Sequence, residues 1–218
     1  DASITEGNLS FKYMGNLVNQ GVGGLDVPNQ MAYGPDGHLY VSSTAGSTVY
    51  RYDGVSGAAL PAPGKAGAEF VSPGAGGLSG ARSIAFGPDG SLYVASQNTD
   101  EVLRFDALTG EPLGSFVPAG SGGLDSPRGL LFQPDGYLYV TSVGLTDPAP
   151  GLDSVLRFDA ASGAPAGISG LPGDAGFIAS GSGGLDNPSK IVFEDGNFYV
   201  ASTASQSILK YSTGGVFL

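Results

Sequence analysis

Short apolar segments separated by glycine-rich turns recur four times along the chain. Each repeat carries a Gly-Gly-Leu segment, an apolar run, an Asp-Gly turn, a second run that reads LYVxS or FYVAS, and a third run with a central cation. The turns are Asp36-Gly37, Asp89-Gly90, Asp135-Gly136 and Asp195-Gly196. Asp-Gly between apolar runs is typical of a β-hairpin, because glycine readily adopts the positive φ that such a turn requires. Each repeat therefore predicts a hairpin.

The runs that flank these turns are apolar on both faces. The second run of each repeat begins at Leu39, Leu92, Leu138 or Phe198, and the third begins at Val49, Val102, Val155 or Ile208. A weaker fourth run follows a Ser-Gly or Thr-Gly turn. No window has sustained helical periodicity, so we expect very little helix. Strands that are apolar on both faces must be covered on both sides, which blades stacked around an axis provide.

The pattern predicts an all-β chain, a β-propeller with four complete four-stranded blade motifs plus an extra N-terminal outer strand. A single domain spans residues 1–218, with blades near 23–71, 76–117, 122–178 and 183–218. The extra strand lies within residues 8–19, between Phe11 and Val18, because Leu17-Val18 precede GGLD as Phe116-Val117 do. We expect it either to close the ring on the fourth blade or to pair with a neighbouring copy. Alternatively, the chain is part of a larger ring.

The third repeat shows the order of motifs in full. It has Pro127, the turn Asp135-Gly136, the run from Leu138 to Val140, and a strand that ends at Phe158. This order resembles the NHL-type propeller repeat, and the phrases GSGGLD, PDG and VLRFD resemble those of exported bacterial propellers. The NHL repeat usually has Asp after its LYVA strand. This chain has serine there, at Ser43, Ser96, Ser142 and Ser202.

Composition restricts the partners. The chain has 9 Lys+Arg against 20 Asp+Glu, a formal net charge of −11, and no cysteine. That charge repels nucleic acid and anionic membrane surfaces, and no apolar run is long enough to cross a bilayer. We therefore expect no nucleic-acid partner, no membrane insertion and no thiolate metal site. The resemblance to exported propellers implies an extracellular or periplasmic location, in a bacterium.

Candidate ligand-binding residues gather in loops on one face of the predicted propeller. That face holds the GGLD-x-P segments and the loops after the LYVxS strands, and function tends to reside in such loops. Equivalent positions in three blades hold Asp26, Asp125 and Asp186, and blade two has Ser79 there. These aspartates either bind calcium through their oxygens or hold their own turns. Ser79 favours a role in the turn for these aspartates, because a serine in blade two would leave a ring of calcium-binding carboxylates incomplete.

Blade three has the longest of these loops, from Val143 to Asp153. An insertion in one blade of a repeat often lies on the binding face. The loop offers the oxygens of Thr146, Asp147 and Asp153, and the neighbouring blade offers Asn98, Asp100 and Glu101. We expect either no cofactor, with the loop simply solvated, or Ca²⁺ held by Asp147 and Asp153, since oxygen ligands suit that ion.

Other recurring polar residues are expected to be structural. The mid-strand cations should pack their stems between blades and pair their heads with carboxylates; they are Arg51, Arg104, Arg157 and Lys210. The PDG aspartates, together with Asp53, Asp106 and Asp159, should hydrogen-bond the backbone of their turns. His38, the only histidine, follows a PDG turn on the face opposite the candidate loops.

These observations favour a non-catalytic extracellular scaffold that binds a protein or glycan, or that assembles with itself. Propeller lyases and lactonases depend on histidine or on converging Glu, Asn and Asp ligands. Here His38 is remote, and Glu101 is the one glutamate in a candidate loop. The alternative is a metal-dependent propeller hydrolase or lyase.

Calcium binding, if it occurs, is expected to depend on the long loop of blade three. Calorimetric titration with calcium should show weaker binding for Asp147→Ala and Asp153→Ala than for the unaltered chain, because each change removes an oxygen ligand. Equal binding by all three proteins would remove this loop from consideration.

Overall fold

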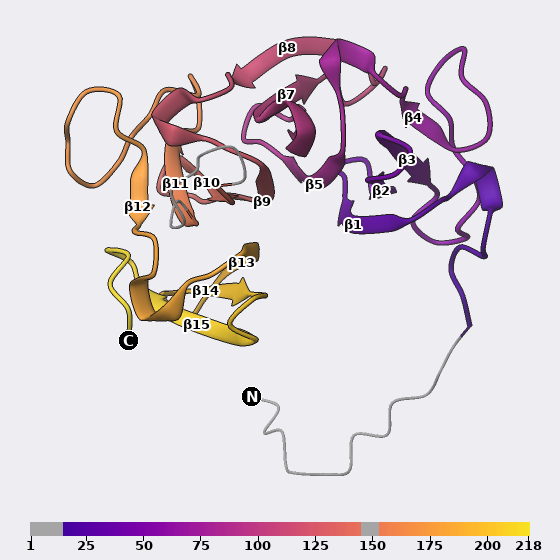
Figure 1. Cartoon of the computed structure of the whole chain (residues 1–218). Helices are drawn as coiled ribbons and strands as arrows, with labels where there is room; N and C mark the ends of the chain where they lie inside the picture. Colours follow the sequence, from indigo (N-terminus) through magenta and orange to yellow (C-terminus); the bar gives the residue numbers. More distant parts are fainter. Residues whose placement is uncertain (1–14, 145–152) are drawn as a thin grey trace, which may run out of the picture.

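Four antiparallel sheets surround a common axis as the blades of a β-propeller, as Figure 1 shows for the computed structural model. The structure describes residues 15–144 and 153–218. Helix in these ranges is limited to 3-10 turns such as η1 (Val22–Gly24). The arc of blades is open between the fourth blade and the first (Figure 1). The sequence-based prediction of an all-β propeller is confirmed.

Each blade is an antiparallel meander whose strands follow one another from the axis outward. Blade one comprises β1 (Pro28–Tyr33), β2 (Leu39–Ser43), β3 (Thr48–Tyr52) and β4 (Glu69–Val71). Blade two comprises β5 (Ala81–Phe86), β6 (Leu92–Ser96), β7 (Glu101–Phe105) and β8 (Pro112–Val117). Blade three comprises β9 (Pro127–Phe132), β10 (Tyr137–Ser142), β11 (Ser154–Asp159) and β12 (Gly176–Ile178). Blade four comprises β13 (Pro188–Glu194), β14 (Asn197–Ser202) and β15 (Ser207–Ser212).

Blade four therefore has three strands where the repeat predicts four. Its outer position holds only an isolated bridge between Tyr211 and Phe217. At the other end, Leu17 lies so close to Gly57 of blade one that a Cβ at this glycine would clash with the Leu17 carbonyl. The equivalent glycines of the later blades face Phe70, Phe116 and Phe177 of the preceding outer strand in the same way. Leu17 thus occupies the place of an outer strand from a preceding blade. The rest of the expected extra strand, residues 8–14, lies outside the described residues.

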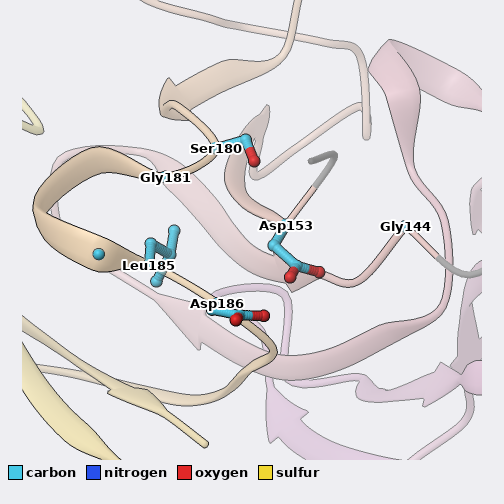
Figure 2. A pocket seen from close by; sticks show the side chains of 7 residues that line it. Gly144, Asp153, Ser180, Gly181, Leu185 and Asp186 are labelled. Atoms are coloured by element: carbon cyan, nitrogen blue, oxygen red, sulfur yellow. The ribbon is translucent and has the colours of Figure 1, made fainter. Parts of the chain in front are cut away.

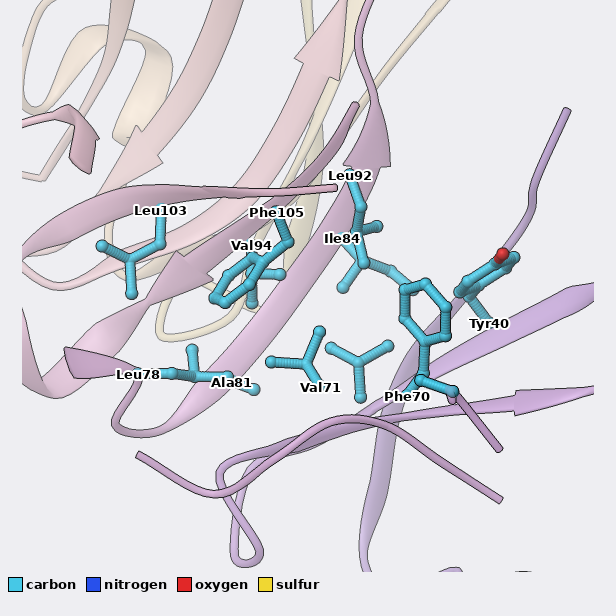
Figure 3. Packing of buried hydrophobic residues seen from close by; sticks show 12 residues of the cluster. Tyr40, Phe70, Val71, Leu78, Ala81, Ile84, Leu92, Val94, Leu103 and Phe105 are labelled. Atoms are coloured by element: carbon cyan, nitrogen blue, oxygen red, sulfur yellow. The ribbon is translucent and has the colours of Figure 1, made fainter. Parts of the chain in front are cut away.

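The core is divided into apolar layers between neighbouring blades. Figure 3 shows the layer between blades one and two, where Tyr40 and Phe70 of blade one face Ile84 and Phe105 of blade two. The Tyr40 ring meets Phe70 and Phe86 edge-on, with centroids 5.0 and 4.9 Å apart. Edge-to-face aromatic pairs add stabilisation beyond the area they bury. Equivalent layers join blades two and three and blades three and four.

Each buried tyrosine also ties its strand to the preceding turn. The hydroxyls of Tyr40, Tyr93 and Tyr139 donate to the PDG aspartates Asp36, Asp89 and Asp135, at 2.9, 3.0 and 2.8 Å. The same carboxylates accept backbone N–H bonds within their own turns. Burial, as the largest cause, raises the pKa of Tyr40 and of Tyr93 to about 12, so these hydroxyls remain donors at neutral pH. The predicted turn role of these aspartates is confirmed.

The mid-strand cations are structural, as expected. The Arg51 guanidinium lies 4.7 Å from the Phe70 ring centroid, and its Nε donates to the Leu60 carbonyl at 3.0 Å. Arg104 approaches Asp89 at 3.6 Å. Asp53 accepts the backbone N–H groups of its turn, and these bonds are the main cause that lowers its pKa. His38 lies beside this turn, with Nδ1 3.7 Å from the Asp53 carboxylate.

One tyrosine of the repeated second strand is less buried than its equivalents. Tyr199 of blade four is half-buried, whereas Tyr40, Tyr93 and Tyr139 are at most 1% exposed. The difference arises because Tyr199 faces the opening of the arc, where no further blade covers it.

Replacing Phe105 with alanine should destabilise the protein by roughly 3–5 kcal/mol, as is typical of a truncated core aromatic. Phe105 is fully buried in the layer between blades one and two. Chemical denaturation of both proteins measures the difference in the free energy of unfolding. A loss below about 1 kcal/mol would contradict the role of this layer in stability.

Candidate functional site

Buried serines hold the loops of the candidate face in place. In blade three, Ser142 Oγ accepts the backbone N–H of Asp125 at 3.0 Å and donates to the carbonyl of the same residue at 2.8 Å. Ser202 forms the same pair of bonds with Asp186, and Ser96 forms it with Ser79. In blade one, Ser43 donates to the carbonyl of Asp26 at 2.5 Å. The serines that end the second strand of each blade thus hold each GGL-x-x segment through its backbone, as a serine clasp.

A second set of bonds joins each loop to the next blade. Asp100 Oδ1 accepts the backbone N–H of Ser126 at 2.8 Å, and Asp153 Oδ2 accepts that of Asn187, also at 2.8 Å. In the first junction, Ser47 Oγ accepts the N–H of Gly80 at the same distance. Two candidate ligands, Asp100 and Asp153, are therefore engaged in joining blades.

The other candidates of this face are dispersed. Asn98 donates to Ser79 Oγ at 3.2 Å, Glu101 begins β7, and Asp125 is buried beside Ser142. Thr146 and Asp147 lie outside the described residues, so the proposed calcium site stays a prediction. Within residues 15–144 and 153–218, no three Asp, Glu, His or Cys side chains come together as a metal site would require.

The structure does bring Asp153 and Asp186 together. They line a pocket of about 490 Å³ at the junction of blades three and four, with Gly144, Ser180, Gly181, Gly184 and Leu185 (Figure 2). We call it the acidic pocket. It lies on the predicted loop face, beside the long loop of blade three.

A second cleft lies at the axis and was not predicted from the sequence. It has a volume of about 430 Å³ and is lined by the inner strands β1, β9 and β13, through Asn29, Gln30, Met31, Arg128, Ser189 and Lys190. We call it the axial cleft. Its signal in the sequence is a cation within two residues of the start of an inner strand, at Arg82, Arg128 and Lys190. The signal is weak because the residue changes from blade to blade.

Neighbouring amides hold Arg128, which lines this cleft, and Arg82, whose charge acts on Arg128. The side-chain amide of Asn29 is oriented so that its oxygen accepts from Arg82 Nη1 at 3.0 Å and its nitrogen donates to the Arg82 carbonyl at 3.2 Å. Arg128 Nη1 donates to Asn187 Oδ1. The Nε atoms of Arg82 and Arg128 are buried and have no hydrogen-bond partner in the described chain. Two guanidiniums thus retain unused donors near the axis.

Burial and neighbouring charges shift the pKa values of the cations at the cleft. Burial lowers the pKa of Arg128, the Arg82 charge lowers it further, and Asp153 opposes both effects. Burial also lowers the pKa of Lys190, even though its side chain remains open to solvent. Desolvation and nearby like charges both disfavour the protonated cation. The axial cleft is therefore lined by the Arg128 guanidinium and by the Lys190 amine, and burial lowers the pKa of both groups.

Asn187 links the axial cleft to the acidic pocket. Its side chain accepts from Arg128, and its backbone N–H donates to Asp153. Arg128 of the axial cleft and Asp153 of the acidic pocket therefore bond to the same residue. The two cavities are thus connected through one residue immediately before β13, although they share no lining residue.

Comparison with known proteins establishes the fold but no family. The chain matches no protein-family profile and no curated protein. Among solved structures it is similar to a gluconolactonase from Xanthomonas campestris, with a TM-score of 0.61, 19% identity, and coverage of 87% of this chain and 60% of that one. It is similar to virginiamycin B lyase from Staphylococcus aureus, with a TM-score of 0.57, 16% identity, and coverage of 88% and 54%. The computationally designed protein Ika4 matches with a TM-score of 0.50, 13% identity, and coverage of 93% and 96%. The chain thus spans about half the length of the lyase.

These neighbours contradict the expectation of a non-catalytic scaffold, because two of them are enzymes. That expectation rested on the scarcity of histidine and glutamate, which argues against only one kind of catalytic centre. It overlooked the cations of the axial cleft. At such low identity the likeness shows the fold alone, so the choice of reaction depends on the side chains of the site.

Replacing Ser142 with alanine should destabilise the protein by about 1–3 kcal/mol, because it leaves the buried N–H and carbonyl of Asp125 without partners. Ser142 is 1% exposed, so water cannot replace the hydroxyl without rearrangement. Thermal unfolding compares it with Ser207→Ala, a serine that is exposed. Equal melting temperatures for the two variants would show that the clasp contributes little.

Proposed function

We propose that this protein is a lyase acting on small carboxylate-bearing substrates, of the class of sugar acids. The observation that carries the proposal is that Arg128 and Lys190 line the axial cleft of an acidic chain with only 9 Lys+Arg, with Arg82 close enough to lower the pKa of Arg128. A solvated structural cation would lie near a carboxylate on the surface. Arg128 instead lies near a second guanidinium, that of Arg82, as well as near Asp153, and the buried Nε atoms of both arginines have no hydrogen-bond partner in the described chain.

The guanidiniums would bind the substrate carboxylate. Arginine forms paired hydrogen bonds with a carboxylate, and a charge-assisted bond of this kind is stronger than a neutral one. Neutralising the carboxylate acidifies the adjacent C–H, because the negative charge that develops on the carboxylate oxygens during deprotonation meets positive charge. Arg82 and Arg128 would thus stabilise the transition state as well as the bound substrate.

Lys190 would be the general base. Its neutral Nζ takes the proton next to the carboxylate, and the electrons of the broken C–H bond form a carbon–carbon double bond. The leaving oxygen on the next carbon departs with its bonding pair and receives a proton from the Lys190 ammonium. The products are an unsaturated acid and an alcohol, and the amine returns to its neutral state.

The comparisons support this proposal only in part. A lyase and a gluconolactonase on the same fold show that propellers of this shape carry enzymes. The alternative expected from the sequence was a metal-dependent hydrolase or lyase. We assign no metal ligand, because the described residues offer no cluster of three suitable side chains. The resemblance of the repeat to the NHL type concerns the blade and is compatible with this reaction.

The reaction is tested by assaying uronate-containing oligosaccharides and other sugar acids for the ultraviolet absorbance of an unsaturated acid product. Removing a general base costs typically about 10²–10⁴-fold in rate, so Lys190→Gln should lower kcat by that factor. Arg128→Gln should mainly raise KM, because it weakens carboxylate binding. The matched control is Lys210→Gln, a lysine of the same blade on β15.

The pH profile separates the base from a merely structural lysine. The neutral amine is the active form, so kcat/KM should rise with pH through the Lys190 pKa. Since burial lowers this pKa, the rise should come at lower pH than for an ordinary lysine. It should vanish in Lys190→Gln and persist in Lys210→Gln. Hydrolysis of a lactone without any unsaturated product would replace the lyase assignment with that of a hydrolase.

A further inference from the structure

The three junctions inside the chain share one pattern. We call the side of a blade that packs on the next blade its trailing face, and the opposite side its leading face. The trailing face of blade one contributes Tyr40, Val49, Phe70 and Val71, and the leading face of blade two contributes Ile84, Leu92, Val94, Leu103 and Phe105. Equivalent residues build the next two junctions. Each blade therefore needs a neighbour on both sides.

The trailing face of blade four has no such neighbour. Ile208 of β15 is 77% exposed, whereas its equivalents Val49, Val102 and Val155 are 0% exposed. Tyr199 is only half-buried for the same reason. The exposed isoleucine lies on an edge strand whose outer side carries no described strand.

The leading face of blade one is uncovered in a complementary way. Met31 of β1 is 68% exposed, while its equivalents Ile84, Leu130 and Ile191 are at most 3% exposed. Tyr33, at the far end of β1, is 61% exposed. In the internal junctions its position holds an aromatic ring that meets the preceding blade, as Phe86 meets Tyr40 at 4.9 Å.

Blade one already carries part of the missing junction. Val18 packs against the apolar cluster of its leading face, which comprises Leu39, Val41, Tyr50, Tyr52 and Ala68. In the internal junctions, the residue at the position of Val18 belongs to the outer strand of the preceding blade. That residue pairs with the valine of the third strand, as Val71 does with Val49 and Val117 does with Val102. Val18 is therefore positioned to pair with a residue equivalent to Ile208.

The hydrogen bond that joins each blade to the next also lacks one partner at each open face. Gln206 precedes β15 with a φ of 54°, as Ser47 and Asp100 do before their strands with φ of 48° and 58°. Ser47 and Asp100 accept the N–H of Gly80 and Ser126 in the next blade. The corresponding residue of blade one is Val27, which also has positive φ and is 56% exposed.

We infer that two copies of this chain assemble head to tail, with the trailing face of blade four on each copy packed against the leading face of blade one on the other. Leu17-Val18 of each copy supplies the missing outer strand beside β15 of its partner. Gln206 of one copy accepts the N–H of Val27 in the other. Two identical junctions then close one ring of eight blades, because head-to-tail contacts give a closed assembly when the rotation returns to its start.

The occupant is a second copy because residues 15–144 and 153–218 do not cover the open faces of blades one and four. Blades one and four lie at opposite ends of the open arc (Figure 1), and Ile208 and Met31 both remain exposed. The lyase and the gluconolactonase with which the chain aligns are longer, since the chain covers 54% and 60% of them, whereas it covers 96% of Ika4. A second copy brings the number of blades toward that of a full ring. A second copy also presents a leading face, and leading faces pack on trailing faces at all three junctions within the chain.

The test is the mass of the 218-residue chain in solution, by light scattering and by sedimentation over a range of micromolar concentrations. The unaltered chain should have the mass of two chains. Ile208→Arg should halve that mass and weaken association at least about tenfold, because an unpaired charge would be buried at the junction. The matched control is Leu108→Arg, since Leu108 is 78% exposed on a turn outside either open face, and it should remain a pair.

Mixing two variants tests the head-to-tail arrangement itself. Ile208→Arg disables the trailing face and Met31→Arg disables the leading face, so each variant alone should be monomeric. A mixture has one intact junction, between blade four of Met31→Arg and blade one of Ile208→Arg, and should form mixed pairs. Circular dichroism shows whether each variant retains its β-structure.

Three results would overturn the inference. The first is a monomeric unaltered chain at every concentration. The second is a pair that Ile208→Arg leaves intact while the β-structure is unchanged. The third is assembly beyond two chains, which would mean that the junctions do not close.

Discussion

The whole structure depends on one constraint: a blade is apolar on both faces and cannot cover either of them itself. The layer between blades one and two shows how the constraint is met, with Tyr40 and Phe70 set against Ile84 and Phe105. Because each layer needs residues from two blades, stability is shared between neighbours. The same constraint makes the two ends of the array special, since Met31 and Ile208 occupy core positions without a neighbour to cover them.

Stacking of this kind also determines where chemistry can occur. The faces of the blades are occupied by packing, so free side chains remain only in the loops and along the axis. The loops are restrained by the serine clasps and by the ties from Ser47, Asp100 and Asp153. Several carboxylates that suggest a ligand site in the sequence are used in this way. The residues left to face a ligand are the cations on the inner strands.

The proposed reaction follows from charge rather than from a metal-binding motif. In a chain of formal net charge −11, a cluster of Arg82, Arg128 and Lys190 is costly unless it serves an anion. Asn29 and Asn187 orient the two arginines without neutralising them. In the proposed reaction, the neutral form of Lys190 would accept a proton next to the bound carboxylate, which is the requirement of an elimination. In a closed pair of chains, the axial clefts of both copies would face a single channel.

The sequence alone determined the blades. A hairpin turn and a strand that is apolar on both faces are local features, and each of the four repeats shows them. The sequence also determined the structural roles of Arg51 and of the PDG aspartates, since recurrence at one position indicates packing. It did not determine the axial cleft, because Asn29, Arg128 and Lys190 are far apart in the chain and differ between blades. Only the curvature of the array brings them together. Nor could it show that Tyr199 and Ile208 are uncovered: their local pattern is that of core residues, and burial depends on the blade that comes next.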